Sequence, residues 1–296
     1  KEASKEIGRT KEKPPELIQQ MRDVGEKIKG LDEEVRIVAS ELDALMLTVP
    51  NIPDGDVPLG ADDSENVLLR TVGEQPSFDF TPLPHYELGE RLDIIDFQRG
   101  VKLSGSRFYV LKGKGARLQR ALISWMLDLH SDEHGYREMY LPDMVTRETA
   151  TGSGQLPKFS ETMYHDEEDD LWMIPTAEVP ITGLHAGEIL TPGELPFRYV
   201  AHTPCFRREK AAAGKDTRGI KRVHQFEKVE MFKFVEAGNS KDELETMVAD
   251  AEDVCARLGL AYQVSLLCTG DLGVASTRTY DLNVWAPGVA EWLEVS

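Results

Sequence analysis

The longest regular pattern of apolar positions lies between Pro15 and about Leu47. Apolar residues alternate there at spacings of four and three, which is the heptad pattern of a coiled-coil helix. The seam consists of Leu17, Met21, Val24, Ile28, Leu31, Val35, Val38, Leu42 and Leu45. A helix of this kind needs a partner helix in water. We expect an antiparallel partner that precedes it in the chain, of which the helical stretch Lys1–Thr10 is the visible end and whose earlier part is truncated. A homodimeric coiled coil through the same seam is the alternative.

Proline and glycine recur in residues 50–60 and an acidic stretch follows, which predicts an irregular linker over residues 50–65. The chain is therefore expected to divide into a coiled-coil arm (1–49), this linker, and a larger domain (66–296). Short alternating stretches and amphipathic stretches share that domain, so its predicted class is α+β. Strands are expected at 66–72, 107–111, 137–141, 171–175, 261–268, 279–285 and 291–296, and helices at 90–102, 115–134 and 240–259, the last opened by a capping box.

The stretch from Phe206 to Glu230 predicts a hairpin with a long polar loop. Its strand ends, 206–209 and 223–234, place residues two or four apart on one face. The residues placed together in this way are Arg207 and Glu209 on the first strand, and Arg222, Phe226 and Glu230 on the second. Guanidinium groups match phosphate, an aromatic ring can stack on a base, and a carboxylate can pair with an ammonium group. Such a surface suits a nucleotide beside an amino acid.

Composition narrows the partners. The net charge of -18 argues against general affinity for DNA or RNA, so any contact with RNA must be local. No apolar run is long enough for a bilayer and no basic-then-apolar leader opens the chain, which predicts a soluble, cytoplasmic protein without a membrane partner. The three cysteines lack Cys-x-x-Cys spacing and the seven histidines lack metal spacing, so we expect reduced thiols and no bound zinc.

The pattern aromatic-Arg207-x-Glu209, a loop, then Arg222-x-x-x-Phe226-x-x-x-Glu230 resembles the second signature motif of class II aminoacyl-tRNA synthetases, and its Arg-Val-His-Gln-Phe context resembles the seryl-tRNA synthetase form. The helix 115–134, Gly135-Tyr136 and the strand before Pro142 resemble the first motif, which builds the homodimer interface in that family. The resemblance implies an antiparallel-sheet catalytic domain with an antiparallel coiled-coil arm, partly missing here, and a third signature motif beyond Ser296.

The resemblance also implies an activity, in which serine reacts with ATP to give seryl-adenylate and the seryl group moves to tRNA(Ser). Arg207 would be the catalytic residue that bridges the serine carboxylate and the α-phosphate. Glu294 would hold Mg²⁺ at the ATP phosphates. The implied ATP-binding residues are Arg207, Arg208, Glu209, Arg222, Val223, Phe226, Glu294, Val295 and Ser296, and the implied serine-binding residues are Thr176, Ala177, Glu178, Arg207 and Glu230.

Three alternatives stay open on the sequence. A class II synthetase of the threonyl or prolyl type would share Arg207, Glu209 and Phe226, although the heptad arm argues against it. A non-catalytic paralogue would bind only tRNA or a protein, although the intact Arg207 argues against that reading. A coiled-coil scaffold with an incidental globular domain is the third.

Overall fold

The structure is a computed structural model that describes residues 15–210 and 218–296. Contacts between Cα atoms divide the chain into two units, one that ends at Val49 and one that runs from Pro50 to Ser296. The expected helix Lys1–Thr10 and most of the hairpin loop, residues 211–217, lie outside the described residues. No helix of the described chain is long and apolar enough to cross a membrane.

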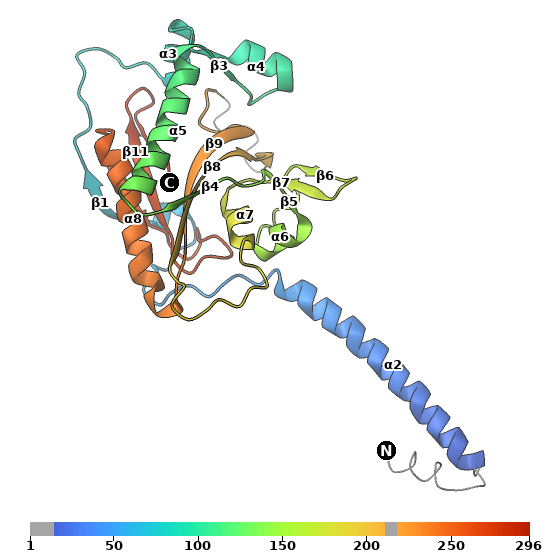
Figure 1. Cartoon of the computed structure of the whole chain (residues 1–296). Helices are drawn as coiled ribbons and strands as arrows, with labels where there is room; N and C mark the ends of the chain where they lie inside the picture. The colour runs from blue at the N-terminus through green and yellow to red at the C-terminus, as the bar shows by residue number, and fades with distance from the viewer. Residues whose placement is uncertain (1–14, 211–217) are drawn as a thin grey trace. The chain divides into compact units, whose positions relative to one another are not determined.

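In the first unit, the heptad stretch forms one continuous helix, α2 (Pro15–Met46) (Figure 1). None of its residues is buried within the described chain. Its seam is largely open, as Val35 at 68% and Leu45 at 62% exposure illustrate. The helix bounds agree with the sequence prediction, and the exposed seam keeps the prediction of a partner helix in place.

The second unit mixes helices and strands, which confirms the α+β prediction. Its strands are β1 (Val67–Val72), β2 (Ile95–Asp96), β3 (Val110–Leu111), β4 (Arg137–Met139), β5 (Met144–Thr146), β6 (His165–Asp166), β7 (Leu171–Met173), β8 (Phe197–Phe206), β9 (Gln225–Phe234), β10 (Tyr262–Leu266), β11 (Tyr280–Ala286) and β12 (Glu291–Glu294). Its helices are α3 (His85–Arg91), α4 (Phe97–Ser104), α5 (Lys114–Asp132), α6 (Arg147–Gly152), α7 (Glu178–Gly183) and α8 (Ser240–Arg257), with 3-10 turns η1 (Asp63–Glu65) and η3 (Ala237–Asn239).

Antiparallel pairing dominates the sheets of this unit. Strands β1, β10, β11 and β12 form one antiparallel sheet in that order. The long strands β8 and β9 pair antiparallel over their whole length, and β4 joins the free edge of β8 in parallel. The predicted hairpin is therefore present as the largest pairing in the molecule.

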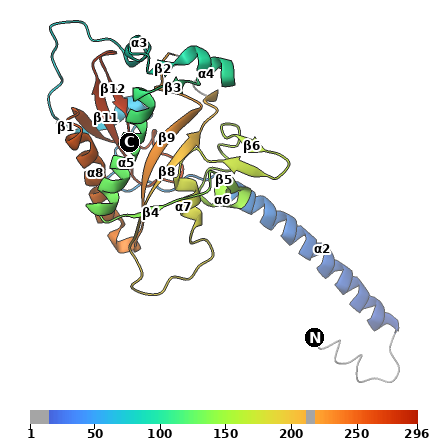
Figure 2. The ribbon, with the colours of Figure 1, turned by 45° about the horizontal axis from the view of Figure 1, so that its top comes forward.

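The β8–β9 hairpin is covered on both faces. On one face Tyr199 packs with Ile181 of α7 in a buried cluster. On the other face Arg198 and Lys233 pair with Glu243 of α8, at 2.8 and 3.0 Å. Helix α5 also lies against β8 and β9 (Figures 1 and 2). The contacts of Arg198 and Tyr199 hold the hairpin near its Phe197–Phe234 end, and Arg207 emerges at the other end.

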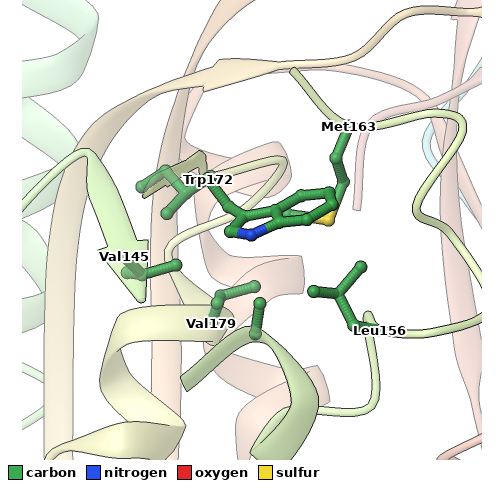
Figure 3. Close-up of a cluster of buried hydrophobic side chains, with 7 residues drawn as sticks. Val145, Leu156, Met163, Trp172 and Val179 are labelled. Atoms are coloured by element: carbon green, nitrogen blue, oxygen red, sulfur yellow. The ribbon is translucent and has the colours of Figure 1, made fainter. Parts of the chain in front are cut away.

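A second core stands beside the hairpin, centred on Trp172 of β7 (Figure 3). Trp172 is only 4% exposed, and its indole N–H donates to Asp170 at 3.1 Å. The apolar side chains packed with it are Val145, Ala150, Leu156, Met163, Ile174 and Val179. Because this core joins β7, α6 and α7, it sets the position of the segment that follows β7.

Two local predictions are wrong. The single helix expected at 90–102 is instead α3, the short strand β2 and α4, because the chain reverses at Asp93, which has a left-handed backbone (φ 55). The capping box at the start of α8 does not form. Asn239 is the N-cap without a side-chain bond, and Glu243 turns to Arg198 and Lys233, whose charges it pairs.

Candidate active site

The hairpin end, the segment after β7 and two loops surround a cleft of about 420 Å³. The cleft is lined by Thr176 and Glu178 after β7, by Arg207 and Glu209 after β8, and by the loops 153–155 and 273–276. Four residues chosen from the sequence thus meet in one cleft, although about 30 residues separate the two pairs along the chain.

Arg207 is held at the first position past β8 by contacts on both sides. Its backbone N–H donates to the His224 carbonyl at 2.9 Å, and its Nε donates to the Pro175 carbonyl at 3.3 Å. Its guanidinium carbon lies 5.0 Å from the centre of the Phe226 ring, a cation–π contact. A guanidinium carries five N–H groups, so the Pro175 bond orients it without exhausting its capacity to bind an anion in the cleft.

Glu209 and Arg222 meet by another route than the sequence predicted. We expected strands through 206–209 and from 223, with their side chains on one pleated face. Strand β8 ends at Phe206 and β9 begins at Gln225, and Glu209 has a left-handed backbone (φ 48) that no strand adopts. An ion pair of 2.8 Å between Arg222 Nη1 and Glu209 Oε2 brings the two together instead. Of the residues predicted to share one strand face, only Phe226 and Glu230 do so, because both lie within β9.

Thr176 joins the segment after β7 to β9. Thr176 is only 5% exposed, and its Oγ1 donates to Glu230 Oε2 at 2.7 Å. Lys228 Nζ lies 2.7 Å from the same hydroxyl oxygen and 2.6 Å from Glu230 Oε2. Lys228 was not among the residues predicted from the sequence, although it stands midway between Phe226 and Glu230 on the face that those two residues share.

Glu178 enters the cleft from a helix rather than from an extended chain. The sequence predicted Thr176 and Glu178 on one side of an extended stretch, but Ala177 is buried with helical backbone angles and Glu178 is the first residue of α7. Its backbone N–H approaches Thr176 Oγ1 at 3.3 Å. Surrounding protein and the Glu230 carboxylate raise the pKa of Glu178, whereas Lys228 lowers it.

Several predicted residues lie away from the cleft lining. The guanidinium of Arg208 packs 5.3 Å from the centre of the Tyr164 ring, and Val223 is buried at 5% exposure. Glu294 ends β12, where it pairs in register with Asn283, and Val295 and Ser296 follow it. Asp281 carries no motif that would have singled it out in the sequence, and its pKa is raised to about 7 by burial and then by Glu294 and Asp271.

Comparison with known proteins explains the combination of arm, hairpin and cleft. The family model "Seryl-tRNA synthetase N-terminal domain" matches residues 1–53, and "tRNA synthetase class II core domain (G, H, P, S and T)" matches residues 158–296. Serine–tRNA ligases of Thermomicrobium roseum and of a Roseiflexus species are each 58% identical to this chain over 295 residues. Those residues cover 99% of this chain, 66% of the first protein and 69% of the second.

The chain belongs to the seryl-tRNA synthetase family. The crystal structure of seryl-tRNA synthetase from Pyrococcus horikoshii complexed with ATP agrees with the fold at a TM-score of 0.93 and 37% identity, over 99% of this chain and 71% of that one. The seryl-tRNA synthetase resemblance and the class II fold predicted from the hairpin motif are therefore confirmed. The family's catalytic fold accounts for the antiparallel sheets and for the cleft at the end of β8.

Proposed function

We propose that the full-length protein activates serine with ATP and transfers the seryl group to tRNA(Ser). The observation that carries this proposal is the cleft in which Arg207 meets Thr176 and Glu178. A cation for two anionic reactants thus lies beside a hydroxyl and a carboxylate suited to an ammonium group. The relatives named serine–tRNA ligases support the choice of serine.

In the proposed reaction, a serine carboxylate oxygen attacks the α-phosphorus of ATP and the bond to pyrophosphate breaks. The two reactants are both anions, so they repel each other as they approach. Arg207 would bind both, with a guanidinium whose orientation Pro175 and Phe226 already fix. Chemistry of this kind depends mainly on holding the reactants in line and stabilising developing charge. The ribose hydroxyl at the end of tRNA would then attack the seryl carbonyl and release AMP.

We assign the nucleotide to the hairpin and to β12. Phe226 would stack on the adenine, Glu209 would accept from its amino group, and the Val223 backbone would help to seat it. Arg208 and Arg222 would approach the phosphates after leaving their present contacts. Residues 294–296 would complete the ATP site.

The negative charge of the ATP phosphates requires a bound cation. We assign Mg²⁺ to Glu294, with the neighbouring carboxyl of Asp281 as a second ligand. Oxygen ligands of this kind suit Mg²⁺. Within residues 15–210 and 218–296 no three potential ligands stand together, so ATP oxygens would supply much of the coordination. Bound Mg²⁺ would neutralise charge on the pyrophosphate leaving group.

Serine selection is assigned to Thr176, Ala177, Glu178 and Glu230. Three of these supply oxygen atoms for an ammonium and a hydroxyl group, and the small, buried Ala177 limits the volume. A pocket that hydrogen-bonds a substrate hydroxyl rejects an amino acid without one, because its own polar groups stay unpaired. Alanine is therefore expected to be a poor substrate, and threonine too large.

The remaining partners are also proposals. We assign residues 1–49 to a tRNA-binding arm, since α2 offers an apolar seam for a second helix. We propose a homodimer because α3 to α5 expose apolar side chains, such as Leu92 at 65% and Leu103 at 73%. A cytoplasmic location agrees with the three buried, free cysteines, since thiols stay reduced there.

Exchange of label between pyrophosphate and ATP tests the proposal, because it requires only amino-acid activation. The assay calls for the full-length protein, since this chain spans 66% to 71% of the relatives described above. We expect exchange with serine and little with alanine, threonine or proline. Exchange driven by threonine or proline would reassign the substrate, and no exchange with any amino acid would favour a non-catalytic protein.

A further inference from the structure

A lysine occupies the pocket that the proposed function assigns to serine. Lys228 Nζ lies 2.6 Å from Glu230 Oε2 and 2.7 Å from Thr176 Oγ1, which are themselves joined by a hydrogen bond of 2.7 Å. The three atoms therefore form a closed triangle of polar contacts. An ammonium group of the protein already holds the acceptors that a substrate ammonium would approach.

The strand explains how Lys228 reaches this place. In β9 the side chain of Lys228 lies on the same face as those of Phe226 and Glu230, and its register partner on β8 is Thr203. Thr203 is 1% exposed, whereas the Lys228 side chain keeps 32% of its surface open. The side chain extends away from buried Thr203, and its ammonium group ends at the hydroxyl of Thr176, a residue that lines the cleft.

Charge balance gives the lysine a role. Two carboxylates of like charge repel each other here, the exposed Glu178 of α7 and the partly buried Glu230 of β9. Arg207 lines the same cleft but is turned toward Pro175 and Phe226. Cys205 on β8 is buried, which raises the pKa of its thiol. Lys228 thus contacts Glu230 directly and acts on Glu178 through its charge.

We propose that Lys228 is a positioning residue of the amino-acid pocket: it fixes Thr176 and Glu230 and offsets the repulsion between Glu178 and Glu230. The inference rests on the proposed function and adds to it a role for Lys228 and a requirement on the charge balance of the pocket, which we call the charge rule. Glu178, Glu230 and Lys228 together carry a single net negative charge, separate from the charge of Arg207 that faces the substrate carboxylate. This net negative charge matches one substrate ammonium group.

The rule predicts a specific dependence on pH. Burial and Glu230 raise the pKa of Glu178, and Lys228 opposes them. Without the lysine, the Glu178 pKa is expected to rise further, so the carboxyl would be protonated at a higher pH and would lose its attraction for the substrate ammonium. A role confined to packing would instead lower activity by the same factor at every pH.

The test measures kcat/KM for serine between pH 5 and 9 in pyrophosphate exchange, with the full-length protein. In Lys228→Met the acid limb of the kcat/KM profile is expected to shift to higher pH by about 1 unit. On the acid side kcat/KM should therefore be roughly tenfold lower than in the wild type, and at alkaline pH it should return to the wild-type value. Lys228→Gln, which keeps a hydrogen-bond donor without charge, should move the limb in the same direction. Lys228→Arg should keep the wild-type profile.

Lys241→Met is the matched control, because it removes one positive charge from an exposed side chain that pairs with Asp54 and does not line the cleft. It should leave the profile unchanged. An unshifted acid limb in both Lys228→Met and Lys228→Gln, with serine-dependent exchange in the wild type, would overturn this inference and leave the proposed function standing. A wild type without serine-dependent exchange would overturn both.

Discussion

Replacing Thr176 by valine tests the serine pocket at its most buried polar atom. Valine keeps the shape of threonine but removes the hydroxyl, and with it the bonds to Glu230 and Lys228, each 2.7 Å long. A hydrogen bond to a charged partner contributes about 1.5 to 3 kcal/mol. Because Lys228 and Glu230 still hold each other at 2.6 Å, we expect a net loss near the lower end, about 2 kcal/mol.

That loss should fall on serine binding. About 2 kcal/mol corresponds to a roughly 30-fold higher KM for serine in pyrophosphate exchange, with the KM for ATP little changed. Thr203→Val is the matched control, since Thr203 is also a buried threonine. It lies in β8, and among the bonds of the described chain its hydroxyl contacts only the sulfur of Cys205, at 3.6 Å. An unchanged KM in Thr176→Val, or an equal rise in Thr203→Val, would refute the reasoning.

Three further predictions concern the scaffold of the site. Hydrogen bonds first from Arg198 and then from Lys233 lower the pKa of Glu243 from 4.5 to about 2, so its stabilisation is present above pH 4.5 and is lost toward pH 2. The difference in Tm between wild type and Glu243→Gln should therefore decrease as the pH falls from 4.5 to 2. An unchanged difference in Tm at pH 2 would contradict this. Trp172→Ala should lower the unfolding free energy by about 3 to 5 kcal/mol in urea titrations, because it empties a core around a residue that is 4% exposed. A loss under 1 kcal/mol would show that the core is not filled as described. Asn51 donates from Nδ2 to the Ala275 carbonyl at 3.1 Å, in the cleft-lining loop 273–276, so Asn51→Ala should raise the KM for ATP or serine about fivefold, while the exposed neighbour Ile52→Ala should not.

The sequence predicted elements well where one periodicity runs for many residues. The heptad seam gave the bounds of α2 within a residue, and the apolar face of 115–134 gave α5. The alternation after Val223 likewise located β9. In these stretches local pattern and tertiary packing agree, so the pattern alone is sufficient.

It failed where a tertiary contact overrides the local pattern. Glu243 leaves its expected capping position because Arg198 and Lys233 lie beneath the helix. Glu209 leaves the strand and meets Arg222 through an ion pair, which no period of two could predict. Four of the predicted site residues line one cleft, Thr176, Glu178, Arg207 and Glu209, but their geometry depends on contacts between segments far apart in the chain.

Lys228 shows the limit of motif-based reasoning about the site. It lies inside the motif that resembles the family, but the motif is defined by its arginine, aromatic and acidic positions, and Lys228 is none of these. Only the distances to Thr176 and Glu230 show that the pocket holds its own cation.

The measurement that tests the account most directly compares Arg207→Met with wild type in serine-dependent pyrophosphate exchange by the full-length protein. Arg198→Met is the control, because Arg198 lies in β8, the strand that Arg207 directly follows, but pairs with Glu243 on the face opposite the cleft. We predict at least a roughly 100-fold loss of exchange in Arg207→Met at an unchanged Tm, as for removal of a charge-stabilising donor, and near-normal exchange in the control. Wild-type exchange in Arg207→Met would contradict the claim that this guanidinium brings the two anionic reactants together.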